Sequence, residues 1–211
     1  VEGNLISAEV GSCSNRLSPD LDTAKAARDH CKRQLELAEA IGARCCVNIA
    51  GSRGAKWDGP SALDYEEETF HMIVRSVQDI IDSVGPARAF YTLETMPWMA
   101  PDSTECYFDL IKAIDREQFA VHFDAVNLVS SPHIYYHNDE LISKFVRRLG
   151  PAIRSCHLKD IILTGELTVV LREIAPGKGE LDYKTLLTAL SELEPDTPLM
   201  VEHLQTAEEY A

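Results

Sequence analysis

Short apolar runs alternate along the chain with longer segments in which apolar residues recur every three or four positions. The apolar runs predict buried strands at 5–11, 45–50, 89–93, 119–127, 153–160 and 199–204. The segments with helical spacing predict helices at 19–41, 62–84, 103–114, 139–149 and 182–193. Apolar strands that alternate with amphipathic helices are typical of a parallel sheet covered by helices.

Residues with strong capping preferences mark the ends of the predicted helices. Ser18 is expected to cap the first helix, with a proline in its first turn and Gly42 after its last residue. Asn138 is expected to cap the fourth helix. We also expect a short strand at 168–172 and the start of a last helix near Ala207.

The number of predicted strands indicates a barrel with units missing. A (β/α)₈ barrel typically takes about 250 residues, whereas this sequence has 211 residues and six main predicted strands. It begins on a strand and ends as a helix begins. We therefore expect an α/β fold, a (β/α)₈ TIM barrel that lacks its N-terminal units and its last helix, in a single domain over residues 1–211.

Composition and charge narrow the classes of partner. Hydrophobic residues make up 45% of the chain, and 34 acidic residues against 20 basic ones give a net charge of −14. Such a surface repels nucleic-acid phosphates and fits an anionic membrane poorly. The sequence contains no run of 18 apolar residues that would span a bilayer and no visible signal peptide. We expect neither nucleic acid nor membrane among the partners.

The six cysteines are scattered along the chain and form no C-x-x-C pair. Reduced, buried thiols in a cytoplasmic protein are the interpretation that this pattern favours over a disulfide framework or a thiolate zinc site. The sequence leaves open whether copies of the chain form a homo-oligomer.

A carboxylate or an imidazole stands near the end of each of four successive strands in the predicted sheet. These residues are Glu94, Asp124, His157 and Glu202, separated by 30, 33 and 45 residues. A strand with its crossover helix takes about 30 residues, so the four residues occupy similar places in successive units. The carboxyl ends of parallel strands meet on one rim, where barrel enzymes have their active sites. We expect the four side chains to lie together there.

Three carboxylates and one imidazole make a hard, oxygen-rich ligand set. Such a set suits one Mn²⁺, Mg²⁺ or Co²⁺ ion, and Zn²⁺ is compatible but less favoured without thiolates. Each residue alone has an ordinary structural alternative: Glu94 as a strand-end residue that reaches water, Asp124 as a helix cap, His157 as a satisfied core histidine, Glu202 as the partner of a lysine. Their coincidence at strand ends favours a metal site.

Residues just beyond the strand ends are weaker candidates for contact with a substrate. Trp98 and Asn127 follow strand ends, and Lys159 lies two residues after His157 on the same face of its strand. We assign these three residues to substrate binding. The alternative for Lys159 is an ordinary surface lysine.

Other polar residues have structural roles as their first interpretation. His122 faces inward one layer below Asp124 and is expected to be a core histidine or to support a ligand. His203 is expected to pack under a helix, and Glu9 is an isolated candidate in the first strand. The glycine-rich loop 51–54 is expected only to turn the chain, with anion binding as the less favoured alternative.

Five segments together resemble the xylose-isomerase-like TIM-barrel superfamily, in particular its sugar phosphate isomerase/epimerase group. The segments, which span nearly the whole chain, are Leu-Glu-Thr-Met-Pro-Trp (93–98), Val-His-Phe-Asp-Ala-Val-Asn (121–127), Ser-Cys-His-Leu-Lys-Asp (155–160), Pro-Gly-Lys-Gly-Glu-Leu-Asp-Tyr (176–183) and Met-Val-Glu-His-Leu (200–204). The resemblance implies one divalent metal ion held by Glu94, Asp124, His157 and Glu202. It also implies that Glu94 and Glu202 are the catalytic acid/base pair. Ketose 3-epimerases of this group tend to carry a histidine three residues after the metal aspartate, and Asn127 departs from that pattern.

The implied function is a metal-dependent isomerase or epimerase acting on a ketose, an aldose or a related small polyol. A metal that chelates a carbonyl and the adjacent hydroxyl stabilises an enediolate, and two glutamates can remove and return the proton. The alternatives are an inosose dehydratase-type lyase on the same metal site and a non-catalytic sugar-binding barrel. The charge and the single imidazole ligand disfavour a barrel endonuclease. The sequence does not name the sugar.

Overall fold

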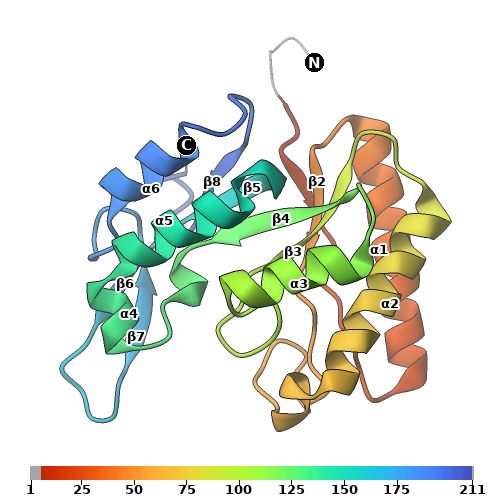
Figure 1. The fold of residues 1–211 in the computed structure, drawn as a ribbon, viewed down its shortest axis with the longest axis horizontal. Helices are drawn as coiled ribbons and strands as arrows, with labels where there is room; N and C mark the ends of the chain where they lie inside the picture. The colour runs from red at the N-terminus through yellow and green to blue at the C-terminus, as the bar shows by residue number, and fades with distance from the viewer. Residues whose placement is uncertain (1–5, 211) are drawn as a thin grey trace.

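Six parallel strands form one curved sheet in the computed structural model, which describes residues 6–210 of the chain (Figure 1). Their order in the sheet is β1, β2, β3, β4, β5, β8, so each strand lies beside the next one of the sheet along the chain. The strands are β1 Glu9–Gly11, β2 Cys45–Asn48, β3 Phe90–Glu94, β4 Phe119–Asp124, β5 Ile153–Leu158 and β8 Leu199–Val201. A curved, sequential and all-parallel sheet is the architecture of an incomplete (β/α)₈ barrel, so the predicted fold class is confirmed.

Each connection between successive strands of this sheet carries a helix. These helices are α1 Leu21–Ile41, α2 Glu67–Val84, α3 Thr104–Ile114, α5 Asn138–Leu149 and α6 Tyr183–Leu190. Consecutive helices contact one another from α1 to α6, so they form a continuous layer outside the sheet (Figure 1). Shorter elements complete the connections, namely α4 Pro132–Tyr136 and the 3₁₀ turns η1 Ala62–Tyr65, η2 Val126–Leu128 and η3 Gly150–Ala152. Within residues 6–210, no helix has both the length and the apolar character needed to cross a membrane.

Capping contacts set the two ends of α1. The N-cap is Asp20, whose carboxylate accepts a hydrogen bond from the Thr23 amide, and not Ser18 as predicted. Asp20 is two residues closer to the helix than Ser18, so its carboxylate reaches the free amides of the first turn. The Ser18 hydroxyl instead accepts a hydrogen bond from the amide of Asp20. Gly42 ends the helix with φ at 76°, the left-handed conformation that glycine adopts without strain.

Three further helix predictions differ from the structure. The helix predicted over 62–84 is two elements, because Glu66 adopts an extended backbone between η1 and α2. Helix α5 has His137 as its N-cap, and the Asn138 side chain instead donates to two backbone carbonyl oxygens, one of them in the connection to α6. Helix α6 ends at Leu190, before the predicted residue 193.

Both ends of the described chain are less regular than predicted. Of the strand predicted over 5–11, Leu5 lies outside the described residues and only Glu9–Gly11 pairs with β2. The chain near Ala207 forms turns instead of the expected helix. Strand β8 ends at Val201, so Glu202 stands directly after it.

A two-stranded hairpin lies between β5 and α6 in the sequence. Its strands are β6 Asp160–Leu163 and β7 Leu171–Ile174, which pair antiparallel. The short strand expected at 168–172 is thus β7, shifted toward the C-terminus. The strand predicted over 153–160 is divided at Lys159, where the chain leaves the barrel sheet and enters the hairpin.

Buried side chains between β3, β4 and the helices hold this part of the sheet in place. All six residues of β4 are buried, and Phe123 stacks on Phe145 of α5 with ring centroids 4.2 Å apart. The hydroxyl of the fully buried Tyr107 in α3 donates to the carbonyl oxygen of Leu93 and lies 3.0 Å from that of Ala120. Burial of each large apolar side chain contributes about 1.5–3 kcal/mol. The strand ends that carry Glu94 and Asp124 are therefore held by a well-packed layer.

Candidate metal centre

Glu94, Asp124, His157 and Glu202 come together at the carboxyl end of the sheet. Glu94 and Asp124 are the last residues of β3 and β4, and the parallel register sets Asp124 beside His157 of β5. One potential ligand atom from each residue lies within 4.8 Å of those of the other three. His157 Nδ1 is 3.2 Å from Glu94 Oε1, 3.4 Å from Glu202 Oε1 and 3.8 Å from Asp124 Oδ2. The four side chains lie together as expected, and metal binding by them stays a prediction.

The surroundings of Glu94 and Asp124 move their pKa values in opposite directions. Burial raises the pKa of Glu94, and the hydrogen bond with His157 offsets this only in part. Burial acts in the same sense on Asp124, but His157 and Lys159 outweigh it and lower the pKa of Asp124. Asp124 Oδ1 also accepts hydrogen bonds from two backbone amides just after the strand. Asp124 is therefore suited to remain an anion, and Glu94 to exchange a proton.

Lys159 is buried among carboxylates, which excludes the interpretation as a surface lysine. Its Nζ lies 2.8 Å from Asp124 Oδ2, 2.6 Å from Glu173 Oε1 and 3.5 Å from Glu202 Oε2, and only 4% of its side chain is exposed. Burial lowers the pKa of Lys159, but Asp124 and Glu173 outweigh it and raise the pKa above its ordinary value. An ammonium ion therefore lies between two of the candidate metal ligands.

Asn127 and Trp98 use their polar atoms to support the rim. Asn127 Nδ2 donates to Glu94 Oε1 at 3.1 Å and to the Thr95 carbonyl at 3.0 Å, which orients the Glu94 carboxylate. Trp98 is half-buried, and its Nε1 donates to the Asp58 carbonyl at 3.0 Å, linking the loop after β3 to the loop after β2. Contact of either residue with a substrate stays a prediction.

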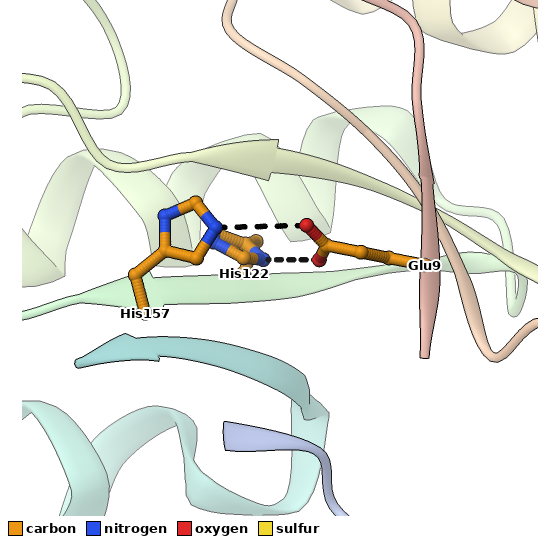
Figure 2. A group of neighbouring side chains, drawn as sticks. All are labelled: Glu9, His122 and His157. Atoms are coloured by element: carbon orange, nitrogen blue, oxygen red, sulfur yellow. Dashed lines mark ion pairs between the residues drawn. The ribbon is translucent and has the colours of Figure 1, made fainter. Parts of the chain in front are cut away.

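His122 and Glu9 lie next to His157 (Figure 2). His122 is fully buried, and its ring stands edge-on to that of His157 with centroids 4.1 Å apart. His122 Nδ1 is 2.6 Å from Ser155 Oγ, and burial lowers the pKa of His122 well below its ordinary value. Glu9 reaches both rings, with Oε1 3.5 Å from His157 Nε2 and Oε2 3.5 Å from His122 Nδ1. Glu9 is thus a neighbour of the centre and not an isolated residue.

Glu173 is a residue of the site that the sequence analysis missed. It lies on β7 and approaches Lys159 from the hairpin, and its other oxygen is 3.4 Å from His203 Nε2. The hairpin sequence has no clear alternation of apolar and polar residues. The sequence therefore did not predict that Glu173 would approach Lys159. His203 does not pack under a helix as predicted. Its side chain is 38% exposed, because the chain leaves β8 at Val201 and turns, with His203 at φ 59°.

Asp160, the first residue of β6, holds the segment 176–183 against the chain just after β5. Its buried carboxylate accepts hydrogen bonds from the amides of Gly179 and Leu181. A side chain at Gly179 would collide with the backbone carbonyl of Ile161 and with Asp160, so the close approach requires glycine. Tyr183 completes the contact by donating its hydroxyl proton to the Lys159 carbonyl at 2.8 Å. This segment holds Lys159 in place.

The loop 51–54 turns the chain, as the favoured interpretation has it. Ser52 Oγ donates to Asp64 Oδ2 at 2.6 Å, and the Arg53 amide donates to Asp64 Oδ1 at 2.8 Å. The loop thus surrounds a carboxylate of the chain itself.

The donor set fits a hard divalent cation. Asp124 Oδ2 is buried, and its polar neighbours are Lys159 Nζ at 2.8 Å and His157 Nδ1 at 3.8 Å. Three carboxylates and one imidazole are the environment in which Mn²⁺, Mg²⁺ or Co²⁺ binds. A cavity of about 1020 Å³ lies between α5 and α6 and is lined by none of these four residues.

The sequence pattern of the family described as xylose isomerase-like TIM barrel matches residues 4–211, and the chain belongs to this family. A comparison with curated proteins finds no match. The family, the parallel sheet and the cluster at its carboxyl end together define a xylose isomerase-like barrel protein with a candidate metal centre.

Several solved structures share the fold. The probable 3-DHS dehydratase AsbF from Bacillus anthracis matches with a TM-score of 0.73 and 14% identity, over 98% of this chain and 73% of that one. A xylose isomerase-like TIM barrel protein from Mycobacterium smegmatis in complex with magnesium matches with a TM-score of 0.71 and 16% identity, over 96% of this chain and 68% of that one. The D-psicose 3-epimerase from Clostridium cellulolyticum H10 with D-tagatose matches with a TM-score of 0.65 and 15% identity, over 92% of this chain and 63% of that one. The chain spans between 61% and 73% of the length of such proteins.

Proposed function

We propose that the protein is a divalent-metal-dependent sugar isomerase or epimerase that moves a proton on a ketose, an aldose or a related small polyol. The observation that carries the proposal is the convergence of three carboxylates and one imidazole at the carboxyl end of the sheet. Membership of the xylose isomerase-like family supports it, as does the fold shared with a D-psicose 3-epimerase.

One divalent ion would be held by Glu94, Asp124, His157 and Glu202. Mn²⁺, Mg²⁺ and Co²⁺ suit this ligand set best, and Zn²⁺ is compatible with it. The Mycobacterium smegmatis neighbour was solved in complex with magnesium, which supports a hard cation. When bound, such an ion polarises the substrate carbonyl and stabilises the negative charge of an enediolate.

Glu94 and Glu202 are the proposed proton carriers. They stand at the ends of β3 and β8, which are separated in the sheet by β4 and β5, so their carboxylates approach the site from different sides. One carboxylate takes the proton from the carbon next to the carbonyl, and the electron pair of the broken C–H bond forms the enediolate. Return of a proton to the opposite face gives an epimer, and return to the neighbouring carbon gives an aldose–ketose isomer.

The remaining candidates orient the substrate. Lys159 presents three ammonium protons beside Asp124 and Glu202 and can donate one of them to a sugar hydroxyl. Asn127 fixes the Glu94 carboxylate, and the half-buried ring of Trp98 is assigned to contact with the sugar.

A lyase of the dehydratase type is the second candidate function. It needs the same removal of a proton, followed by departure of a hydroxyl group. Two observations support it: the buried Lys159 ammonium lies beside the candidate ligands Asp124 and Glu202, where it can donate a hydrogen bond to a leaving hydroxyl, and the probable 3-DHS dehydratase shares the fold. Asn127 stands where ketose 3-epimerases tend to carry a histidine, and this departure is compatible with a reaction other than 3-epimerisation.

Turnover in D₂O tests the proposal and separates the two functions. Protein loaded with Mn²⁺ is incubated with a panel of ketoses, aldoses and inososes, and the products are analysed by mass spectrometry and NMR. An isomer or epimer that carries deuterium on the reacting carbon is expected, because a carboxylate open to water exchanges its proton. Loss of water from the product would assign the lyase. Metal-loaded protein that turns over nothing, while Glu202→Gln binds sugars equally well, would leave the non-catalytic sugar-binding barrel.

A further inference from the structure

Both ring nitrogens of His157 face carboxylates, although only one of them faces the candidate metal position. Nδ1 points to Glu94, Glu202 and Asp124 at 3.2 to 3.8 Å. Nε2 points the opposite way, to Glu9 Oε1 at 3.5 Å (Figure 2). Glu9 comes from β1, a strand that contributes none of the four candidate ligands.

We propose that Glu9 is a positioning residue, whose carboxylate holds the His157 ring with Nδ1 turned toward the metal position. The inference rests on the proposed function, because it needs His157 to be a metal ligand. A neutral imidazole that gives Nδ1 to a metal keeps its single proton on Nε2, and that N–H requires an acceptor in a site where only 10% of the His157 side chain is exposed. Glu9 Oε1 is the carboxylate oxygen that the structure places there.

The second oxygen of Glu9 strengthens the assignment. Oε2 is buried without a hydrogen-bond partner and lies 3.5 Å from His122 Nδ1, so the carboxylate spans both rings. His122 is fixed in turn by Ser155 Oγ at 2.6 Å and stands edge-on against the His157 ring. Glu9 and His122 thus restrict the His157 ring from two directions, and both would have to move for the ring to turn.

The chemistry of the group favours this role over a second metal site. A second ion among Glu9, His122 and His157 would take Nε2 of an imidazole whose Nδ1 already faces the first position, so the ring would have to lose its last proton. Only one carboxylate would neutralise that ion, and His122 Nδ1 is already in hydrogen-bond contact with Ser155. An acceptor for the ring N–H requires none of these changes. Carboxylates that orient metal-binding histidines in this way typically change metal affinity by about 10–100-fold when removed.

The test measures metal affinity of the purified, chelator-treated protein by competition of Mn²⁺ with a metal-sensitive indicator dye. Glu9→Leu removes the acceptor at similar volume and should weaken Mn²⁺ binding by about 10–100-fold. Glu9→Gln keeps an oxygen that can accept the Nε2 proton and should lose less than Glu9→Leu. Glu36→Gln is the matched control, because it also removes one negative charge, from an exposed position on α1. This variant should bind Mn²⁺ with the affinity of the wild type. The visible spectrum of Co²⁺-loaded protein should change in Glu9→Leu, because the ring is no longer held in one orientation. Circular dichroism confirms the fold of each variant.

Three results would overturn the inference. Equal Mn²⁺ affinity and an unchanged Co²⁺ spectrum in both Glu9 variants would show that the contact does not hold the ring. Two ions per wild-type chain, with one of them lost in Glu9→Gln, would make Glu9 a ligand of a second site. Unchanged affinity with lost turnover would make Glu9 a group that acts on the substrate. If the wild type itself binds no divalent ion, the proposed function fails and this inference fails with it, an outcome distinct from all three.

Discussion

Replacing Lys159 with methionine would test the electrostatics of the candidate centre most directly. The Lys159 ammonium lies 2.8 Å from Asp124 Oδ2, and the two side chains are 4% and 0% exposed. Methionine keeps an unbranched apolar chain of similar length and removes the charge. The variant therefore leaves a buried carboxylate whose nearest cation is gone.

The expected loss is large because both groups are buried. Removing one partner of a buried ion pair costs about 3–5 kcal/mol, since the remaining charge is left uncompensated. In a chain of 211 residues, one kcal/mol shifts the melting temperature by about 2–4 °C. Lys159→Met should thus lower the melting temperature of the metal-free protein by at most roughly 6–20 °C, because the protonated His157 ring, 3.8 Å away, still faces Asp124. A divalent ion bound beside Asp124 supplies the missing positive charge, so saturating Mn²⁺ should restore most of this loss.

Thermal unfolding followed by circular dichroism measures the effect, with and without Mn²⁺ after treatment with a chelator. Lys144→Met is the matched control. Lys144 Nζ also forms an ion pair, at 2.7 Å from Glu105 Oε1, but the two side chains are 60% and 67% exposed. Exposed pairs of this kind contribute about 0–1 kcal/mol, so the control should melt close to the wild type in both conditions.

Two results would refute this reasoning. If Lys159→Met melts as high as Lys144→Met without metal, the contact with Asp124 does not stabilise the fold. If Mn²⁺ raises the melting temperature of Lys159→Met no more than that of the wild type, the ion does not take up the position beside Asp124.

Three further predictions address the metal and the chemistry. His157→Ala should lose the single divalent ion expected per chain, measured by elemental analysis after gel filtration, and full occupancy would remove His157 from the ligand set. Glu202→Gln should lower kcat by roughly 10²–10⁴-fold with metal retained, and a near-normal rate would exclude Glu202 from proton transfer. Burial lowers the pKa of His157, but hydrogen bonds to carboxylates, that of Asp124 foremost, outweigh it and raise the pKa to about 12 in the metal-free protein. Because this pKa exceeds the value of about 6.5 for a free histidine, the protonated ring stabilises the fold fully below about 6.5 and ceases to do so as the pH rises through about 12. Metal must displace this proton, so its apparent affinity should rise with pH by about tenfold per unit for each proton released. Calorimetric titrations in buffers of different protonation enthalpy would detect the proton, and an affinity independent of pH would contradict the assignment.

The hydrophobic pattern correctly predicted the order of the six strands of the main sheet and of the five helices that cover it, because a parallel strand is apolar throughout and its covering helix is apolar on one stripe. The boundaries were less predictable. Ser18 and Asp20 are both good N-caps, and only the path of the chain decides which side chain reaches the free amides. The helical stripe over 62–84 is continuous in the sequence, but the structure interrupts the helix at Glu66. The preceding turn η1 carries Asp64, which is held by the amide of Arg53 in another loop, so a contact distant in sequence accompanies the break.

The sequence by itself determined that Glu94, Asp124, His157 and Glu202 stand at the ends of successive strands. The parallel order of a βα chain then brings them to one rim, whatever the details of packing. Only the tertiary structure decided which groups surround them. It set Glu173 of the hairpin on Lys159, and Glu9 of the first strand on His157. These partners lie far apart in the chain, and their contacts depend on the curvature of the sheet and the path of a hairpin. The spacing of apolar residues along the sequence indicates the type and the approximate ends of each strand and helix. It does not indicate which strands and helices face one another across the barrel.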